Sequence, residues 1–482
     1  MTEPAAGLYA APGPLCPRLG AWKIAVPCLL VYRSLGQFAL PEGALEVLGK
    51  EPATGVDATT GLAAVMRVCV NGLAATGIST HSAALWFVAA TAAACVAVVF
   101  ATAVRLLPSR RAALQCTLLA ATCPAVAFAA TSVHLHVAPW LLSALACWAA
   151  AGWACSGSRA ADRGDGRRAW PWALLTGAVT GVAHASTPLG ALLPLAVAPV
   201  LWLGAERPHG PAISRWGAQI ALALAVHLGI AALALARGLG AGFPGLAEVA
   251  ACDPGALLLL LAREWLRGCL PLSLVAACLL LHPKRLVPAL ELHVALAAYL
   301  LLGNHATASL GNDGACLLPL VPPAALLAMH ALGERRGLVW FLVLLSAAVA
   351  WAKIDVRSDW ARYRTYMNWV DAAKQGKPFL LLTGPRLEEA LRLREPAVPA
   401  VSVRQVARGP APSPVECVAY VRHALANGDR VLLTDEAEFA LRDAAFQARY
   451  SLASSLLHEL DHAFVWRPRH DHGLIAKEMV LR

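Results

Sequence analysis

Acidic residues are concentrated in a segment that follows the first long apolar stretch of the chain. Within residues 41–61 the only cation is Lys50, against four carboxylates: Glu42, Glu46, Glu51 and Asp57. A carboxylate can act as a general base toward a hydroxyl group, or can hold a divalent metal ion. The same charges could also simply keep a surface loop in water. The segment is therefore a candidate catalytic or metal-binding loop, with an ordinary solvated loop as the alternative.

Two arginines have a spacing that suits an anionic ligand. Arg263 and Arg267 are four positions apart, so on a helix they lie on one face. Their guanidinium groups can bind a phosphate group through paired hydrogen bonds. Lipid headgroups could occupy the same face without specificity, and both interpretations stay open.

Polar residues also stand at the ends of apolar stretches. His134 opens one stretch, two positions before His136, and residues at i and i+2 do not share a helix face. His184 lies where a long apolar run must break into two helices. It could bind a ligand there, or hydrogen-bond the backbone that the break exposes. The segment 303–313 is polar and Gly-rich, and it adds the candidates Asn304, His305 and Asp313.

The C-terminal region contains His458-Glu459-Leu460-Asp461-His462, which matches the H-E-x-x-H zinc pattern. That chemistry needs a helix, on which both histidines face one metal ion while the glutamate activates its water. A helix is possible here, but residues 463–466 read as a strand, with 458–462 as its polar start. No third ligand is obvious, although His470, His472 and Glu478 follow. We expect no stoichiometric zinc at His458 and His462, and a zinc hydrolase remains a minor alternative.

The composition shows in what surroundings these residues act. Of 482 residues, 58% are apolar and 15% are charged, and the mean hydropathy is +0.58. These values exclude an ordinary soluble enzyme and a disordered chain. The net charge of +10 does not indicate a nucleic-acid partner, because membrane proteins carry excess Lys and Arg beside their spans. Eleven apolar stretches predict membrane-spanning helices: 22–40, 82–104, 112–130, 133–155, 171–186, 188–204, 216–236, 268–282, 286–303, 314–332 and 337–352.

The charges between the spans predict their orientation. With the N-terminus in the cytoplasm, the outer loops hold few cations, namely Lys50, Arg237, Arg263 and Arg267. Residues 61–78 contain Arg67 and Asn71, so we interpret them as an interfacial helix and not as a span. The predicted parts are a cytoplasmic tail at 1–21 and a transmembrane domain at 22–352, with a first outer loop at 41–81.

Residues 353–482 have the charge density of a soluble domain, and an odd number of spans places them outside the cytoplasm. Short apolar runs predict strands, and the segments between them predict helices. The strands are expected at 378–383, 398–403, 430–434, 462–467 and 474–481, and the helices at 357–375, 413–427 and 436–450. The expected fold class is an α-helical polytopic membrane protein with a C-terminal α/β domain.

Several short motifs of the membrane domain resemble those of one family. They are Leu30-Val31-Tyr32-Arg33-Ser34-Leu35, Val56-Asp57-Ala58-Thr59-Thr60-Gly61, the surroundings of His134, Ala183-His184-Ala185-Ser186, and Asp313 with Leu317-Leu318-Pro319. With the arrangement of spans, they resemble the GT-C superfamily of membrane glycosyltransferases, in the branch related to protein O-mannosyltransferases. Where that branch shows Trp-Asp-Ser-Gly-Glu, this chain has Asp57 but Thr60 or Gly61 in place of the second acid. The His-Pro-Pro-Gly run that follows in the family is missing.

The resemblance implies an inverting transferase that takes a sugar from a polyprenyl-phosphate carrier at the outer membrane face. It implies that Asp57 deprotonates or orients a hydroxyl of a protein or glycan acceptor. Arg263 and Arg267 would hold the lipid phosphate as it leaves. The pocket would be lined by His134, His184, Asn304, His305 and Asp313. A divalent metal ion is the one cofactor considered, and no metal ligands are assigned.

Because the second acid is missing, a protein of another class stays as an alternative. That alternative is a degenerate, non-catalytic membrane scaffold or assembly subunit whose outer domain binds a partner. A transporter is disfavoured, because most spans have no charge near the middle and no inverted repeat is visible. The expected location is a bacterial plasma membrane in preference to the endoplasmic reticulum.

Overall fold

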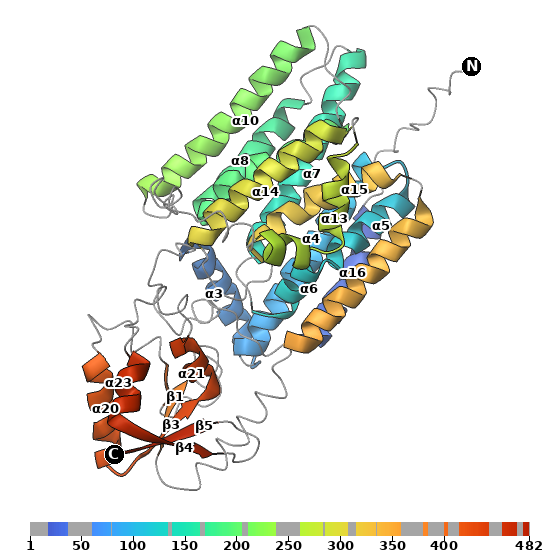
Figure 1. The fold of residues 1–482 in the computed structure, drawn as a ribbon. Coiled ribbons are helices and arrows are strands. Elements are labelled where there is room, and N and C mark those ends of the chain that lie inside the picture. The colour runs from blue at the N-terminus through green and yellow to red at the C-terminus, as the bar shows by residue number, and fades with distance from the viewer. Residues whose placement is uncertain are drawn as a thin grey trace. The chain divides into compact units, whose positions relative to one another are not determined.

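The structure of the chain is a computed structural model (Figure 1). It describes residues 18–36, 60–78, 80–133, 137–163, 169–204, 211–237, 261–282, 285–306, 315–333, 335–357, 379–383, 400–402, 414–442, 456–469 and 476–481. The described residues fall into two compact units, a larger one that ends at Val356 and a smaller one that begins at Arg357.

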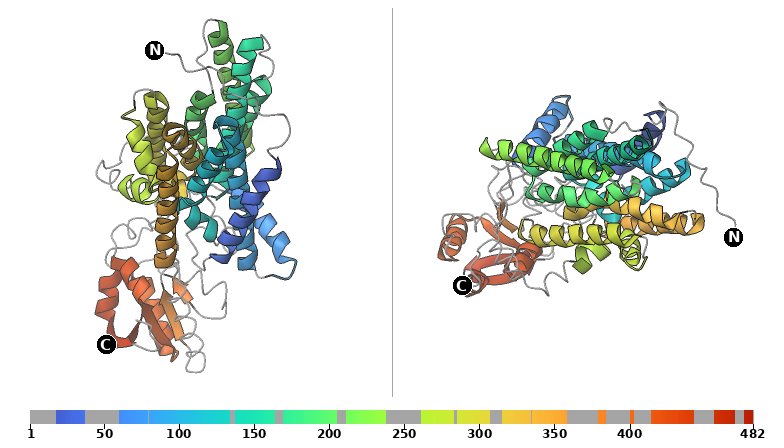
Figure 2. Two further views of the ribbon diagram at one scale, coloured as in Figure 1. Left: turned by 90° about the vertical axis from the view of Figure 1, so that its right-hand side faces the viewer. Right: turned by 90° about the horizontal axis from the view of Figure 1, so that it is seen from above.

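The described part of the larger unit is helical, and its long helices lie side by side (Figures 1 and 2). The first half contains α1 (Arg18–Ser34), α3 (Thr60–Ala74), α4 (Thr80–Leu106), α5 (Arg110–Ala121), α6 (Pro124–Thr131), α7 (Val137–Arg163), α8 (Trp170–Ser186) and η2 (Pro188–Leu192). The second half contains α9 (Leu193–Gly204), α10 (Pro211–Ala236), η3 (Leu261–Arg267), α13 (Leu272–Leu279), α14 (Leu286–Ala306), η5 (Ala315–Leu320), α15 (Val321–Leu332) and α16 (Arg336–Arg357).

Each of the eleven predicted spans coincides with at least one helix. By length and composition, however, three described helices could cross a membrane: Ser82–Leu106, Val137–Ser156 and Trp216–Ala236. A fourth span is possible if α5 and α6, which are bent by 63°, act as one. The predicted span 268–282 is helical only over α13. A multi-pass helical membrane domain therefore agrees with the structure, while the number eleven stays a prediction.

The bend between α5 and α6 has a cause in the sequence. Pro124 begins α6 and has no backbone N–H, so the preceding helix cannot continue through it. The next donor, the N–H of Ala125, bonds to the carbonyl oxygen of Gly268 at 2.8 Å. Every residue of α6 is buried. The break thus joins α6 to the turn that follows η3.

Helices α8 and α10 approach each other closely through glycines. A Cβ atom on Gly177 would lie 2.3 Å from the carbonyl oxygen of Ala223, and one on Gly181 would lie 3.0 Å from that of His227. Small residues four positions apart permit such contact between helix backbones. Four residues before Ala223 on α10, Gln219 accepts the indole N–H of Trp153 on α7 at 2.7 Å. The glycines therefore determine which side chains of α8 and α10 meet.

A cation between two indoles joins α4, α7 and α8. The guanidinium carbon of Arg105 lies 4.5 Å from the ring centroid of Trp148 and 4.8 Å from that of Trp172. Such cation–π contacts stabilise by about 0.5–2 kcal/mol. A Cβ atom on Gly152 would lie 2.5 Å from the Trp172 ring, so this contact also depends on a glycine.

The predicted interfacial helix is present as α3, a separate helix between α1 and α4. Met66 and Val70 are buried, whereas Val65 and Val68 are exposed. The exposed apolar side chains suit a surface in contact with lipid. The place of α3 at the membrane surface stays a prediction.

The smaller unit contains a five-stranded sheet in the order β2-β1-β3-β5-β4. Strands β1 (Phe379–Thr383), β2 (Ala400–Ser402) and β3 (Arg430–Thr434) pair in parallel, and β5 (Ala476–Leu481) pairs antiparallel with β3 and β4 (Phe464–Arg469). A strand therefore lies at each of the five predicted places. Helices α20 (Pro414–Ala426), α21 (Asp435–Arg442) and α23 (Leu456–Ala463) pack with the sheet around a core that includes Val421, Val431, Leu433, Leu441, Leu460, Phe464 and Met479.

Candidate functional site

The predicted site residues fall into three groups. Asp57, His134 and Asp313 lie outside the described residues. The backbone is described, but not the side chain, for three more: Arg263 on η3, and Asn304 and His305 in the last turn of α14. His184 and Arg267 are described in full.

The break expected at His184 occurs three residues later, between α8 and η2. The N–H of Thr187 donates to the carbonyl of Ala183 at 3.0 Å, and Oγ1 of Thr187 accepts from the N–H of Gly190 at 3.0 Å. Oγ of Ser186 donates to the carbonyl of Val182 at 2.7 Å. The prediction that the apolar run breaks here is confirmed. The side chains of Thr187 and Ser186 therefore hydrogen-bond the backbone at this break.

His184 has a side-chain partner on another helix. Its Nδ1 lies 3.2 Å from Nε2 of His227 on α10, and the two rings are stacked with centroids 5.1 Å apart. One nitrogen must donate and the other must accept, so this contact requires at least one neutral ring. His227 is buried, with 4% of its surface exposed. The close approach at Gly181 brings the rings together, and His227 thereby fixes the orientation of His184.

Sequence reasoning missed His227 and gave Arg33 no role. Arg33, in the last turn of α1, donates from Nη2 to Oγ of Ser82 at 2.8 Å and lies 5.2 Å from the ring centroid of Trp86. The neighbouring Tyr32 donates its hydroxyl hydrogen to the carbonyl of Ala121 at 2.8 Å. Both residues could have been recognised as candidates from the sequence, because each is an ionisable side chain inside a predicted span.

The segment η3 places one of the two predicted phosphate-binding arginines at the surface. Arg267 is exposed, whereas the adjacent Trp265 and Glu264 are buried at 2% and 4% exposure. The segment has π-helical hydrogen bonding, a form that occurs often at functional sites. Its end is tied to α6 by the bond from Ala125 to Gly268. Arg267, the last residue of η3, therefore lies directly before an anchored residue.

The elements that carry or adjoin the predicted residues contact one another. Helix α3, which begins three residues after Asp57, contacts α8. The segment η2, directly after the α8 break, contacts α14. Helix α14 contacts η5, which begins two residues after Asp313, and η5 in turn contacts η3. We call α3, α8, η2, α14, η5 and η3 the site group.

The zinc pattern in the smaller unit lies on a helix, so the interpretation of 458–462 as the start of a strand is wrong. Helix α23 includes the whole motif, and β4 begins only at Phe464. Leu460 is buried in the core, while His458 and His462 are exposed. In the described part of the chain, no group of three or more His, Cys, Asp or Glu side chains is placed to hold a metal ion.

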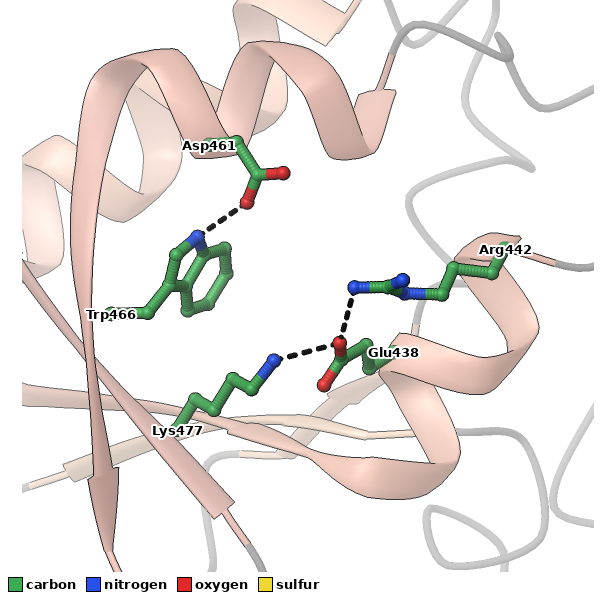
Figure 3. Close-up of polar contacts among 5 residues, drawn as sticks. All are labelled: Glu438, Arg442, Asp461, Trp466 and Lys477. Carbon is green, nitrogen blue, oxygen red and sulfur yellow. Dashed lines mark hydrogen bonds and ion pairs between the residues drawn. The ribbon is translucent and has the colours of Figure 1, made fainter.

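An ion pair between Glu438 and Lys477 fastens α21 to the sheet of the smaller unit (Figure 3). Oε1 of Glu438 accepts from Nζ of Lys477 on β5 at 2.7 Å and from Nη2 of Arg442 at 2.7 Å. Burial alone would raise the pKa of Glu438, but Lys477 and then Arg442 outweigh it and hold the pKa below its ordinary value. The indole N–H of Trp466 on β4 donates to Asp461 on α23.

A crystal structure of ArnT from Cupriavidus metallidurans bound to undecaprenyl phosphate is similar to this chain, with a TM-score of 0.49 and 15% sequence identity. The similarity covers 96% of this chain and 97% of the ArnT chain. No family model matches the chain, and no curated protein matches it.

Proposed function

We propose that the chain is a membrane glycosyltransferase of the GT-C type. It takes a sugar from a polyprenyl-phosphate carrier and transfers it to an acceptor hydroxyl at the outer face of the membrane. The contacts within the site group are the observation that carries the proposal. The sequence assigns several residues to one pocket, although they are up to about 250 positions apart in the chain. The elements that carry these residues, or that begin next to them, contact one another.

The reaction needs a base and a means of stabilising the leaving group. The acceptor oxygen attacks the anomeric carbon, the bond from that carbon to the carrier phosphate breaks, and its electron pair leaves with the phosphate. Asp57 takes the hydroxyl proton. Arg263 and Arg267 stabilise the negative charge that develops on the phosphate. The product sugar has the opposite anomeric configuration, because attack and departure occur on opposite faces.

The histidine pair serves this site by positioning. His227 holds the ring of His184 at the end of α8, next to the η2 corner that contacts α14. A ring held in one orientation loses less conformational freedom when a ligand binds to it. In this account Asn304, His305, His134 and Asp313 complete the wall of the pocket.

The site belongs to the larger unit, with the smaller unit outside the cytoplasm. The proposed boundaries are a cytoplasmic tail to residue 21, a membrane domain at 22–352 and an outer domain at 353–482. The proposed location is a bacterial plasma membrane, and the acceptor is a protein or a glycan.

Purified full-length protein in detergent tests the proposal with a radiolabelled sugar on a synthetic polyprenyl phosphate. We expect transfer to an acceptor mixture from the same cells. Arg263→Ala should raise the KM for the carrier more than it lowers kcat, because it removes a phosphate contact. As a matched control, Arg237→Ala removes an outer-loop arginine outside the site group and should leave the KM unchanged. No transfer by the folded wild-type protein would favour the scaffold alternative.

A further inference from the structure

Two exposed histidines stand on one face of α23. His458 and His462 are four positions apart, so they are neighbours on the helix surface. Their ring centroids lie 4.5 Å apart and their planes are nearly perpendicular, at 87°. Two imidazoles that each place a nitrogen about 2.0–2.1 Å from a shared zinc ion have centroids roughly 4.5–5.5 Å apart. The observed separation lies at the lower end of that range.

The helix that carries them is held in place. Leu456 and Leu460 are buried in the core of the smaller unit at 3% and 1% exposure. Strand β4 follows α23 without a gap, and Asp461 accepts the indole hydrogen of Trp466 on that strand. Because the buried leucines determine which face points outward, a metal ion would meet two ligands on a fixed element, at a low entropy cost.

We infer that His458 and His462 form a surface site for one divalent d-block cation such as Zn²⁺. This inference replaces the expectation from sequence that no stoichiometric zinc binds there, since the motif lies on a helix and not at the start of a strand. Imidazole nitrogen prefers these ions, whereas Mg²⁺ and Ca²⁺ prefer oxygen ligands. Glu459 is exposed on the same helix, three positions before His462, and adds a negative charge beside the ion. This inference does not depend on the proposed glycosyl transfer.

Within the described ranges, His458 and His462 do not have the third ligand of a zinc hydrolase. Zinc enzymes use three protein ligands and a water. Glu478, a described carboxylate that follows the motif, is paired with Arg430 at 3.0 Å. His470 and His472, the other candidate ligands from sequence, lie outside the described residues.

The test is titration calorimetry of chelator-treated full-length protein in detergent with Zn²⁺. The wild type, His458→Ala and His462→Ala are compared with His423→Ala. That control removes another exposed histidine of the smaller unit. His423 lies on α20, and its Nδ1 is 3.2 Å from Nδ2 of Asn427 in the turn that follows. Loss of an outer-shell partner already lowers metal affinity by about 10–100-fold, so loss of a ligand should cost at least about tenfold.

We expect one Zn²⁺ site that either α23 variant weakens by at least about tenfold and that His423→Ala leaves intact. Mg²⁺ should not compete. The inference is overturned if the wild type binds no Zn²⁺, if His458→Ala binds it as tightly as the wild type, or if His423→Ala loses it equally. Both replaced side chains are exposed, so the α23 variants should unfold at the wild-type temperature without metal, and their folding can be checked in that way.

Discussion

Nδ1 of His184 and Nε2 of His227 lie 3.2 Å apart, on helices whose backbones meet at Gly177 and Gly181. The two histidines are 43 positions apart in the chain. One comes from the end of an apolar run and the other from the middle of a different helix. Their meeting turns two isolated polar residues into one hydrogen-bonded unit that links α8 of the site group to α10.

Replacement of His227 by alanine should destabilise the protein and disturb the site. The hydrogen bond to His184 is lost in a largely buried place, which costs about 1–3 kcal/mol. We expect a lower unfolding temperature in detergent and slower sugar transfer. His293→Ala is the matched control, because His293 bonds to the carbonyl of Ala289 on its own helix at 2.7 Å. Equal effects of both changes would show that the pair has no special role.

Replacement of Gly177 by alanine should separate α8 from α10. The added Cβ would lie 2.3 Å from the carbonyl oxygen of Ala223, which is backbone and cannot turn away. Overpacking of this kind costs about 1–3 kcal/mol. Gly229→Ala on α10 is the control, since nothing lies within 4 Å of a Cβ there. Thermal unfolding of the purified variants measures the difference, and a Gly177 variant as stable as the Gly229 variant would contradict the packing.

The sequence predicts local structure here better than contacts between elements. Apolar runs indicate the positions of the helices, and Pro188 marks the break after α8, because these signals come from neighbouring residues. The break at Pro124 was missed, since the run 112–130 is apolar on both sides of the proline. His227 was missed because its partner comes from another helix. The motif at 458–462 was ambiguous because β4 begins directly after α23.

The ion pairs of Glu438 should make the stability of the smaller unit depend on pH. Because the folded pKa of Glu438 lies below its ordinary value, its contribution is complete above about pH 4.5. The contribution is lost as the pH falls through the lower folded pKa. It should be at most about 1 kcal/mol, since the pairs are only partly buried. Unfolding of the full-length protein at several pH values should show that Glu438→Gln loses less stability than the wild type as the pH falls. An identical pH profile for the two proteins would contradict this.

The predicted topology can be tested with epitope tags on whole cells. A tag after Arg482 should be accessible from outside, because an odd number of spans follows a cytoplasmic N-terminus. A tag at Ser109, which caps the start of α5, should be accessible only after the membrane is opened. Reversed labelling would remove the basis for placing the site group and the first loop at the outer face.

The central claim is that Asp57 is the base of an outer-face sugar transferase. Transfer from a polyprenyl-phosphate sugar by folded Asp57→Asn protein tests it most directly, with Glu42→Gln and Glu46→Gln as controls from the same loop. We predict that Asp57→Asn abolishes transfer at an unchanged unfolding temperature, while both controls retain it. Full activity of Asp57→Asn would contradict the claim, and loss of activity in Glu42→Gln or Glu46→Gln in its place would identify that carboxylate as the base.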